Sequence, residues 1–188
     1  MTAFHPYFTT LNPMTKAVFP GTFDPIHYGH IDIARRAAHL FDEVILAVYD
    51  KPLKSLLFSP EERIAMVQEA FKEHPNIRVT GYSGLTVAFC RQIQAQVIVR
   101  GLRVFSDFEH EFRMALANYR LAPDIEVIAF ITHEEHTFLS STTVREIASL
   151  GGDISSMVPE HVAKALNARF VSQGSENLKM TYMTSLRD

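Results

Sequence analysis

The sequence predicts an α/β fold, a single Rossmann-like domain in which helices cover both faces of a doubly wound, parallel, five-stranded sheet. From residue 16 onward, short β-branched runs alternate with segments of helical period, and this βαβα order is typical of parallel sheets. The runs are rich in apolar, β-branched residues, which indicates buried strands. With 188 residues, the chain can bury one substantial core and is too short for two ordinary domains.

Five runs are expected to be strands and six segments to be helices. The strands are 17–19, 43–49, 77–80, 97–99 and 125–131. The helices are 30–40, 60–74, 85–94, 107–121, 141–150 and 159–170. Ser59, Pro60 and Glu62 predict the start of the second helix, as its N-cap, its first residue and the partner in a capping box. Gly151 and Gly152 predict the end of the fifth helix.

The domain is expected to occupy residues 14–170. Residues 1–13 and 171–188 show little periodicity and are dotted with Thr, Ser and Asn. We therefore expect 1–13 to be a disordered N-terminal extension and 171–188 to be a C-terminal tail, with no chemistry assigned to either.

Composition argues against several classes of protein. The formal net charge is -3, from 18 Lys and Arg against 21 Asp and Glu, so no broad cationic face is expected for nucleic acid. The single cysteine, Cys90, can form neither an internal disulfide nor a cysteine-rich metal cage, which fits a reducing cytoplasm. No apolar run approaches the ~18 residues that a membrane span needs, and no signal-peptide pattern is present. We expect a cytoplasmic protein that binds neither nucleic acid nor membrane.

The residues after the first strand indicate a phosphate site, because ligands of open parallel sheets bind beyond the carboxyl ends of the strands. The strand runs into a turn and then a helix, which brings backbone N–H groups, a hydroxyl and a histidine to a positive helix terminus. These residues are Pro20-Gly21-Thr22-Phe23-Asp24-Pro25 and His27-Tyr28-Gly29-His30. The sequence contains neither a P-loop nor a GxGxxG fingerprint, which argues against a P-loop NTPase and a standard dinucleotide enzyme.

Two motifs resemble those of a known family. The run 21–30 is similar to the (T/H)xGH signature of the nucleotidyltransferase superfamily, whose histidine acts on the phosphates of a nucleoside triphosphate. The run 99–103, Val-Arg-Gly-Leu-Arg, with Asp107-Phe108-Glu109-His110-Glu111, resembles the RGLR and DFExE signature of phosphopantetheine adenylyltransferases. The resemblance covers about residues 16–170. It implies transfer of the adenylyl group of ATP to 4′-phosphopantetheine, with Mg²⁺ bridging the triphosphate, by a homohexamer.

The resemblance also assigns roles to residues. His30 is the expected catalytic residue and would face the triphosphate with Arg103 and Ser141, while Glu111 would bind the sugar or base of ATP. The acceptor would be bound by Thr22, Lys54, Thr86 and Arg100, with Lys51 left as a competitor of Lys54. The full set expected at the ATP site is Thr22, Phe23, His30, Gly101, Leu102, Arg103, Glu111, His136, Thr137, Phe138, Leu139, Ser140, Ser141 and Thr142. No residue is expected to be a metal ligand.

Each assignment has a structural alternative. Arg100 and Arg103 could belong to a solvated turn after the strand, and residues 140–142 could be an ordinary Ser/Thr N-cap. Four apolar residues after Asp107 are expected in the core or a subunit contact; they are Phe112, Met114, Leu116 and Tyr119.

Two rival functions remain, adenylyl transfer to a nicotinate nucleotide and a nucleotide-binding module without turnover. The run 100–111 argues against the first.

Overall fold

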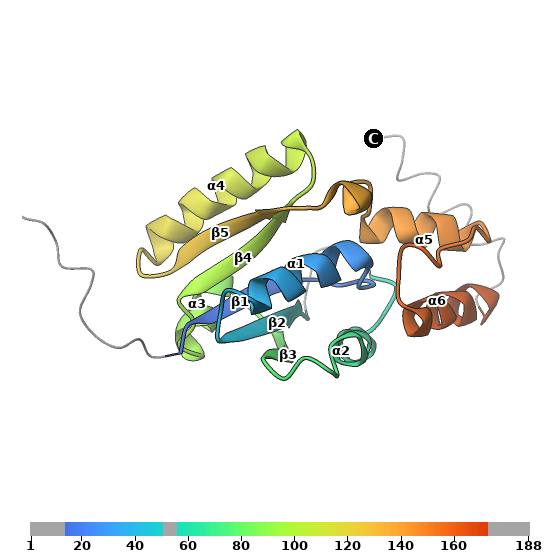
Figure 1. Cartoon of the computed structure of the whole chain (residues 1–188), viewed down its shortest axis with the longest axis horizontal. Coiled ribbons are helices and arrows are strands. Elements are labelled where there is room, and N and C mark those ends of the chain that lie inside the picture. Colours follow the sequence, from blue (N-terminus) through green and yellow to red (C-terminus); the bar gives the residue numbers. More distant parts are fainter. Residues whose placement is uncertain (1–13, 51–55, 173–188) are drawn as a thin grey trace, which may run out of the picture.

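The structure, a computed structural model, describes residues 14–50 and 56–172, so the predictions made for 1–13, for Lys51 and Lys54, and for 173–188 lie outside it. The described chain forms one sheet of parallel strands in the order β3-β2-β1-β4-β5 (Figure 1). The strands are β1 (Lys16–Gly21), β2 (Glu43–Tyr49), β3 (Ile77–Tyr82), β4 (Val97–Leu102) and β5 (Glu126–Ile131). The sequence-based prediction of a doubly wound, five-stranded sheet is therefore confirmed.

Helices connect the strands in the predicted alternation. They are α1 (Tyr28–Ala38), α2 (Pro60–Ala70), α3 (Thr86–Gln92), α4 (Phe105–Leu121), α5 (Ser141–Ser149) and α6 (Glu160–Ser172), with a short 3-10 turn, η1 (Glu134–His136). The second helix begins as predicted, because the Ser59 backbone N–H donates to the Glu62 carboxylate at 2.7 Å. Helix α5 ends at the predicted glycines, where Gly151 has a φ of 74° that favours glycine.

The sheet is packed on both faces, and alternate residues of each strand point to opposite sides. On one face, residues such as Phe19 and Leu46 pack against α1, α2, α5 and α6. On the other face, Val18, Ile45 and Ile98 pack against α3 and the end of α4. The strand order reverses between β1, the central strand, and its neighbour β4, and the carboxyl ends of the strands lie beside the amino ends of α1, α4 and α5.

Two features of the predicted sheet were wrong. Arg100 and Gly101 lie within β4, not in a loop after it, because the ladder to β5 continues as far as Leu102 and Ile131. Strand β5 is not buried along its length: Ile131 is 76% exposed, since β5 is the edge strand and α4 leaves part of it uncovered.

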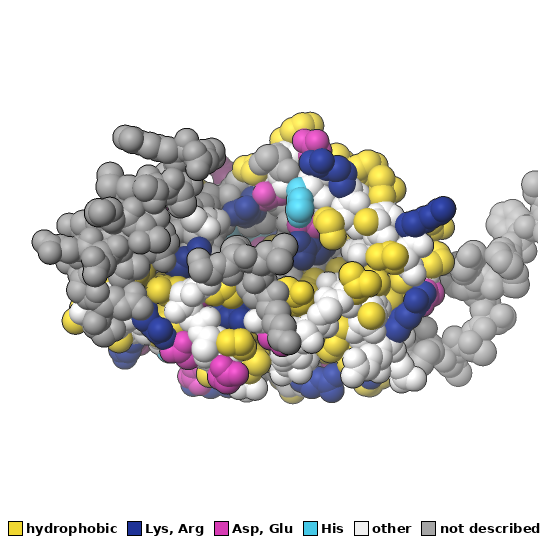
Figure 2. Space-filling view, turned by 180° about the vertical axis from the view of Figure 1, so that it is seen from behind, with side chains coloured by type: hydrophobic (Ala, Val, Ile, Leu, Met, Phe, Trp, Pro, Cys, Tyr) yellow, Lys and Arg dark blue, Asp and Glu magenta, His cyan; other side chains and the backbone are white. Residues whose placement is uncertain are grey.

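Helix α4 carries a row of exposed apolar side chains. Figure 2 shows hydrophobic side chains gathered on the side of the molecule where α4 lies. Of the four residues expected in the core or a subunit contact, Phe112 is 53% exposed and Tyr119 is 62% exposed, so the single chain does not bury them. The others are Met114 and Leu116, and Phe105 and Phe108 extend the row. Within the described ranges, no helix is long and apolar enough to cross a membrane.

Candidate active site

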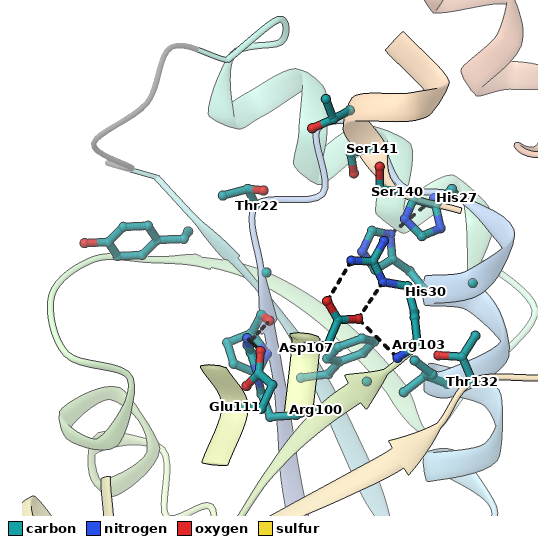
Figure 3. Close-up of a pocket in the computed structure, with 18 of the residues that line it drawn as sticks. Thr22, His27, His30, Arg100, Arg103, Asp107, Glu111, Thr132, Ser140 and Ser141 are labelled. Atoms are coloured by element: carbon teal, nitrogen blue, oxygen red, sulfur yellow. Dashed lines mark hydrogen bonds and ion pairs between the residues drawn. The ribbon is translucent and has the colours of Figure 1, made fainter. Parts of the chain in front are cut away.

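A cleft of 530 Å³ opens at the carboxyl ends of the strands, where the sequence predicted a phosphate site (Figure 3). The turn after β1, the amino ends of α1 and α5, the end of β4 and one side of α4 all contribute to it. The predicted site residues that line it are Thr22, His30, Thr86, Arg100, Gly101, Arg103, Glu111, Ser140, Ser141 and Thr142. Segments far apart in the sequence, from Phe19 to Thr142, therefore meet in one site.

His30 lies in the first turn of α1 with its ring turned into the cleft. Its ring stacks on that of His27 at a centroid distance of 3.7 Å and makes edge contacts with Phe19 and Phe23. The Nδ1 atom of His30 accepts a hydrogen bond of 3.4 Å from the backbone N–H of His27. The ring is thus held from several sides by groups of its own turn and of β1.

The His30 imidazole is neutral at physiological pH. Burial, followed by the positive charges of Arg103 and Arg100, lowers its pKa from 6.5 to about 3. Because Nδ1 accepts a hydrogen bond, the neutral ring carries its proton on Nε2. Burial also lowers the pKa of His27, and the nearby His30 adds to this effect. His30 can therefore donate one hydrogen bond to a ligand oxygen but cannot supply a positive charge.

Two arginines at the end of β4 supply the positive charge of the described cleft. Arg100 binds Glu111 through two hydrogen bonds, from Nε at 2.6 Å and from Nη2 at 2.5 Å. Arg103 binds Asp107 in the same way, at 2.9 Å from Nε and 3.1 Å from Nη2. Asp107 and Glu111 are four residues apart on α4, so they share one face of that helix. Each guanidinium is therefore held by a carboxylate along its Nε–Nη2 edge, and its Nη1 donates to a backbone carbonyl oxygen, that of Pro20 for Arg100 and that of Leu139 for Arg103.

Glu111 lines the cleft, and its carboxylate holds Arg100 at the cleft wall. Its predicted contact with the sugar or base of ATP stays a prediction. Arg103 is fixed further by a 2.7 Å hydrogen bond from Nη1 to the Leu139 carbonyl oxygen. The arginines are thus components of a built site, and the alternative of a solvated turn is wrong.

Hydroxyl groups line other parts of the cleft. The Thr86 hydroxyl lies 3.0 Å from the phenol oxygen of Tyr82, at the start of α3. Ser140 is the N-cap of α5, because its Oγ accepts from the backbone N–H of Thr143 at 3.0 Å. Ser141 Oγ donates to the Pro25 carbonyl oxygen at 2.8 Å. The N-cap alternative for this segment is correct for Ser140, and the amino end of α5 still faces the cleft.

Six residues predicted at the ATP site do not line this cleft; they are Phe23, Leu102, His136, Thr137, Phe138 and Leu139. The side chains of Phe23 and Leu139 are buried in the core. His136 stacks near Tyr28, at a ring distance of 6.5 Å, and Thr137 donates to the His133 carbonyl oxygen. Phe138 is 58% exposed in a separate surface hollow. Of this set, the Leu139 backbone is tied to the site through Arg103.

Asp107, His27 and Thr132 are among the lining residues to which sequence reasoning assigned no role. Asp107 was quoted only as part of a motif, although its spacing of four residues from Arg103 was a usable signal. His27 and Thr132 are buried at the cleft, and His27 Nδ1 and Thr132 Oγ1 have no hydrogen-bond partner among the described residues. Such buried polar atoms indicate places where a bound ligand can supply the missing partner.

The site can bind and align anions, but it offers few groups for proton transfer. His30 is a neutral donor, the guanidinium groups are permanent cations, and Asp107 and Glu111 are occupied by the arginines. Among residues 14–50 and 56–172, no group of three or more His, Cys, Asp or Glu side chains is placed to hold a metal ion. The geometry suits a reaction in which charge moves between bound phosphates.

Comparisons with known proteins agree with this geometry. The model of the cytidylyltransferase-like family matches residues 18–147. A phosphopantetheine adenylyltransferase of Roseiflexus sp. (strain RS-1) is 53% identical over 157 residues, which are 84% of this chain and 98% of that protein. The phosphopantetheine adenylyltransferase of Herpetosiphon aurantiacus is 51% identical over 84% of this chain and 95% of its own.

A solved structure gives independent support for the fold. It belongs to a Vibrio parahaemolyticus protein assigned as a nicotinate-nucleotide adenylyltransferase, and it matches with a TM-score of 0.62. The match covers 87% of this chain and 95% of that one, at 21% sequence identity. At that identity the likeness supports the architecture and leaves the acceptor open.

Proposed function

The chain belongs to the phosphopantetheine adenylyltransferases of the cytidylyltransferase-like family, and we propose that its cleft performs this family's reaction. The enzyme is a nucleotidyltransferase that transfers the adenylyl group of ATP to 4′-phosphopantetheine and releases pyrophosphate; the product is dephospho-coenzyme A. The observation that supports this most strongly is the meeting of His30, Arg100 and Arg103 in one cleft, each held by its own partner.

The reaction depends more on aligning the two substrates than on activating the attacking phosphate. The attacking group is a phosphate monoester whose second pKa is near ~6, so it is already an anion at neutral pH. It attacks the α-phosphorus of ATP, a new P–O bond forms, and the bond to the departing pyrophosphate breaks. The protein has to bring two anions together and stabilise the charge that moves onto pyrophosphate. The neutral His30 and the paired arginines suit that task, since none of them is a general base.

We assign the two ends of the cleft to the two substrates. His30, Arg103 and the amino end of α5 at Ser141 bind the triphosphate, because they lie together on one side of the cleft. Arg100, Thr22 and Thr86 bind the acceptor. Lys54 joins the acceptor group by family position. Six residues predicted at the ATP site lie outside the cleft lining. For the segment that includes Leu139, backbone contacts to ATP stay a prediction.

Magnesium enters this proposal as part of the substrate. The carboxylates of the cleft are engaged by arginines, and the described residues form no metal cage. Mg²⁺ commonly keeps water ligands and binds through substrate phosphates. We therefore expect Mg²⁺ to arrive with ATP and to neutralise part of the triphosphate charge.

The exposed apolar face of α4 supports an oligomer. Phe105 is 85% exposed and stacks towards Phe108, whose ring in turn stacks on Phe112. A contiguous apolar row of this kind is typical of a surface that another protein covers. We propose a homohexamer in the cytoplasm. The single cysteine, Cys90, fits a reducing compartment, and it is buried, which raises its pKa to about 12.

The function is tested by supplying purified protein with ATP, Mg²⁺ and one acceptor at a time, while pyrophosphate release and the adenylylated product are measured. Turnover is expected with 4′-phosphopantetheine. Turnover with nicotinate mononucleotide in its place would assign the enzyme to the rival acceptor. ATP binding without turnover for any acceptor would indicate a nucleotide-binding module and contradict the proposal.

A further inference from the structure

A third guanidinium lies beneath the cleft. Arg63, on α2, is 1% exposed and is among the largest fully buried side chains. Its Nη1 donates to the carbonyl oxygens of Thr22, at 2.6 Å, and Tyr49, at 2.8 Å. Its Nε donates to the carbonyl oxygen of Phe58 at 3.2 Å. A single side chain thus joins the turn after β1, the last residue of β2 and the residue before the N-cap of α2.

The bonds of Arg63 extend the sheet beyond its last paired residues. The β1–β2 ladder ends with Gly21 opposite Val48. Thr22 and Tyr49 are the next residues on each strand, and their carbonyl oxygens both accept from the same nitrogen of Arg63. The guanidinium therefore joins the two segments one residue beyond the last pair of the β1–β2 ladder, at the edge of the cleft.

Burying the charged side chain of Arg63 costs folding free energy, so its presence indicates that the orientation of the carbonyl groups it binds is important. Burial disfavours the charged form of Arg63 and lowers its pKa, although the nearby carboxylates of Asp24, Asp50 and Glu61 oppose this effect. Its hydrogen bonds within the described part of the chain go to backbone carbonyl groups. Buried neighbours on the same helix, Met66 and Val67, are apolar. An apolar side chain would leave the three carbonyl oxygens without this donor. The planar fork of arginine gathers several acceptors at fixed angles, which a lysine ammonium does not do.

The region around Arg63 is held from the other side as well. The buried Asp24 carboxylate accepts from the backbone N–H groups of Leu57, at 2.9 Å, and Phe58, at 3.0 Å. It also binds Arg145 of α5, at 2.6 Å. The turn 22–25 is thus fixed relative to the segment before α2, and Arg63 adds the end of β2. Thr22 and Tyr49 both line the cleft.

From this geometry, and resting on the function proposed above, we propose that Arg63 is a positioning residue for the acceptor half of the cleft. By fixing the carboxyl ends of β1 and β2 at one spacing, Arg63 sets where Thr22 and Tyr49 face the acceptor. It touches neither substrate. Its loss therefore weakens acceptor binding selectively. His30 and Arg103 are held by other partners, so their binding of ATP is unaffected.

The test compares Arg63→Met and Arg63→Lys with a matched control, Val67→Ala. Val67 is a fully buried residue of α2, and its truncation loosens the core without touching the strand ends. For each protein the KM for 4′-phosphopantetheine, the KM for ATP, kcat and the melting temperature are measured. The lysine variant keeps the charge and is the variant expected to fold if the methionine variant does not.

Both Arg63 variants are expected to raise the KM for phosphopantetheine about tenfold and to change the KM for ATP less than about twofold. Val67→Ala is expected to melt earlier with both KM values unchanged. Equal shifts in the two KM values, or a lower melting temperature alone, would overturn the inference and leave the proposed function standing. A wild-type enzyme that makes no dephospho-coenzyme A would overturn the proposed function and this inference with it.

Discussion

Replacing His30 by alanine removes a donor that points into the cleft and leaves most of the core intact. The imidazole is neutral and carries its proton on Nε2, so it contributes one hydrogen bond to a phosphate oxygen. Removing one such donor aimed at developing charge typically costs ~3 kcal/mol in the transition state, or about a hundredfold in turnover. The lost edge contacts with Phe19 and Phe23 add a smaller cost in folding stability, about 1–2 kcal/mol.

The assay is kcat for pyrophosphate release at saturating substrates, with the melting temperature as a check on folding. His30→Gln is the matched control, because its amide N–H can stand near the position of Nε2. We expect the glutamine variant to lose about tenfold and the alanine variant about a hundredfold. An alanine variant within about threefold of the wild type would refute the reasoning, since the ring would then have no contact that strengthens in the transition state.

The same residue predicts how stability depends on pH. The pKa of His30 falls from 6.5 to about 3 on folding, because burial and the arginines disfavour the imidazolium. Between these values the unfolded chain binds a proton that the folded chain does not, so stability declines as pH falls from 6.5 towards 3. The expected loss is a few kcal/mol. Denaturant unfolding at several pH values should show a shallower decline in His30→Gln, and identical slopes would contradict the assigned protonation state.

Three further predictions concern the arginines, their partners and the surface of α4. Arg100→Ala is expected to raise the KM for phosphopantetheine about tenfold and the KM for ATP less, whereas Arg103→Ala does the reverse; equal effects on both substrates would refute the assignment of the cleft's two ends. Asp107→Asn is expected to raise the KM for ATP about fivefold, because Arg103 loses the carboxylate that orients it, and an unchanged value would show that Leu139 alone suffices. In sizing experiments the wild type is expected to elute as a hexamer and Phe112→Glu as a smaller species, because a charge replaces an apolar contact; a wild-type monomer would contradict the proposed assembly.

The fold could be predicted from the sequence because hydrophobic periodicity and helix signals agree along the chain. Ser59, Glu62 and Gly151 mark helix ends where the structure has them. The exposure of β5 could not be predicted, because an apolar run predicts burial without indicating whether a helix of the same chain or another subunit provides the cover. Arg100 illustrates the same limit, since the ladder to β5 extends the strand through polar residues that local propensity assigns to a loop.

The candidate site was predictable where a motif fixes both residue and position. The (T/H)xGH and RGLR motifs placed Thr22, His30, Arg100 and Arg103 correctly at one cleft. The ion pair between Glu111 and Arg100 was not predictable, because a motif does not say which neighbour a carboxylate binds. Arg63 gave no signal as a site residue, since an arginine on an amphipathic helix is normally solvated. Its contacts depend on how the ends of β1 and β2 meet, which is a property of the folded chain.

The identity of the acceptor is the central claim, and the ratio of kcat/KM values for 4′-phosphopantetheine and nicotinate mononucleotide tests it most directly. Both acceptors are phosphate monoesters, so the comparison isolates the parts of the cleft that recognise the rest of the molecule. We predict at least about a thousandfold preference for 4′-phosphopantetheine, as expected for a site built around one acceptor. Comparable values for the two acceptors, or a preference for the nicotinate nucleotide, would contradict the account.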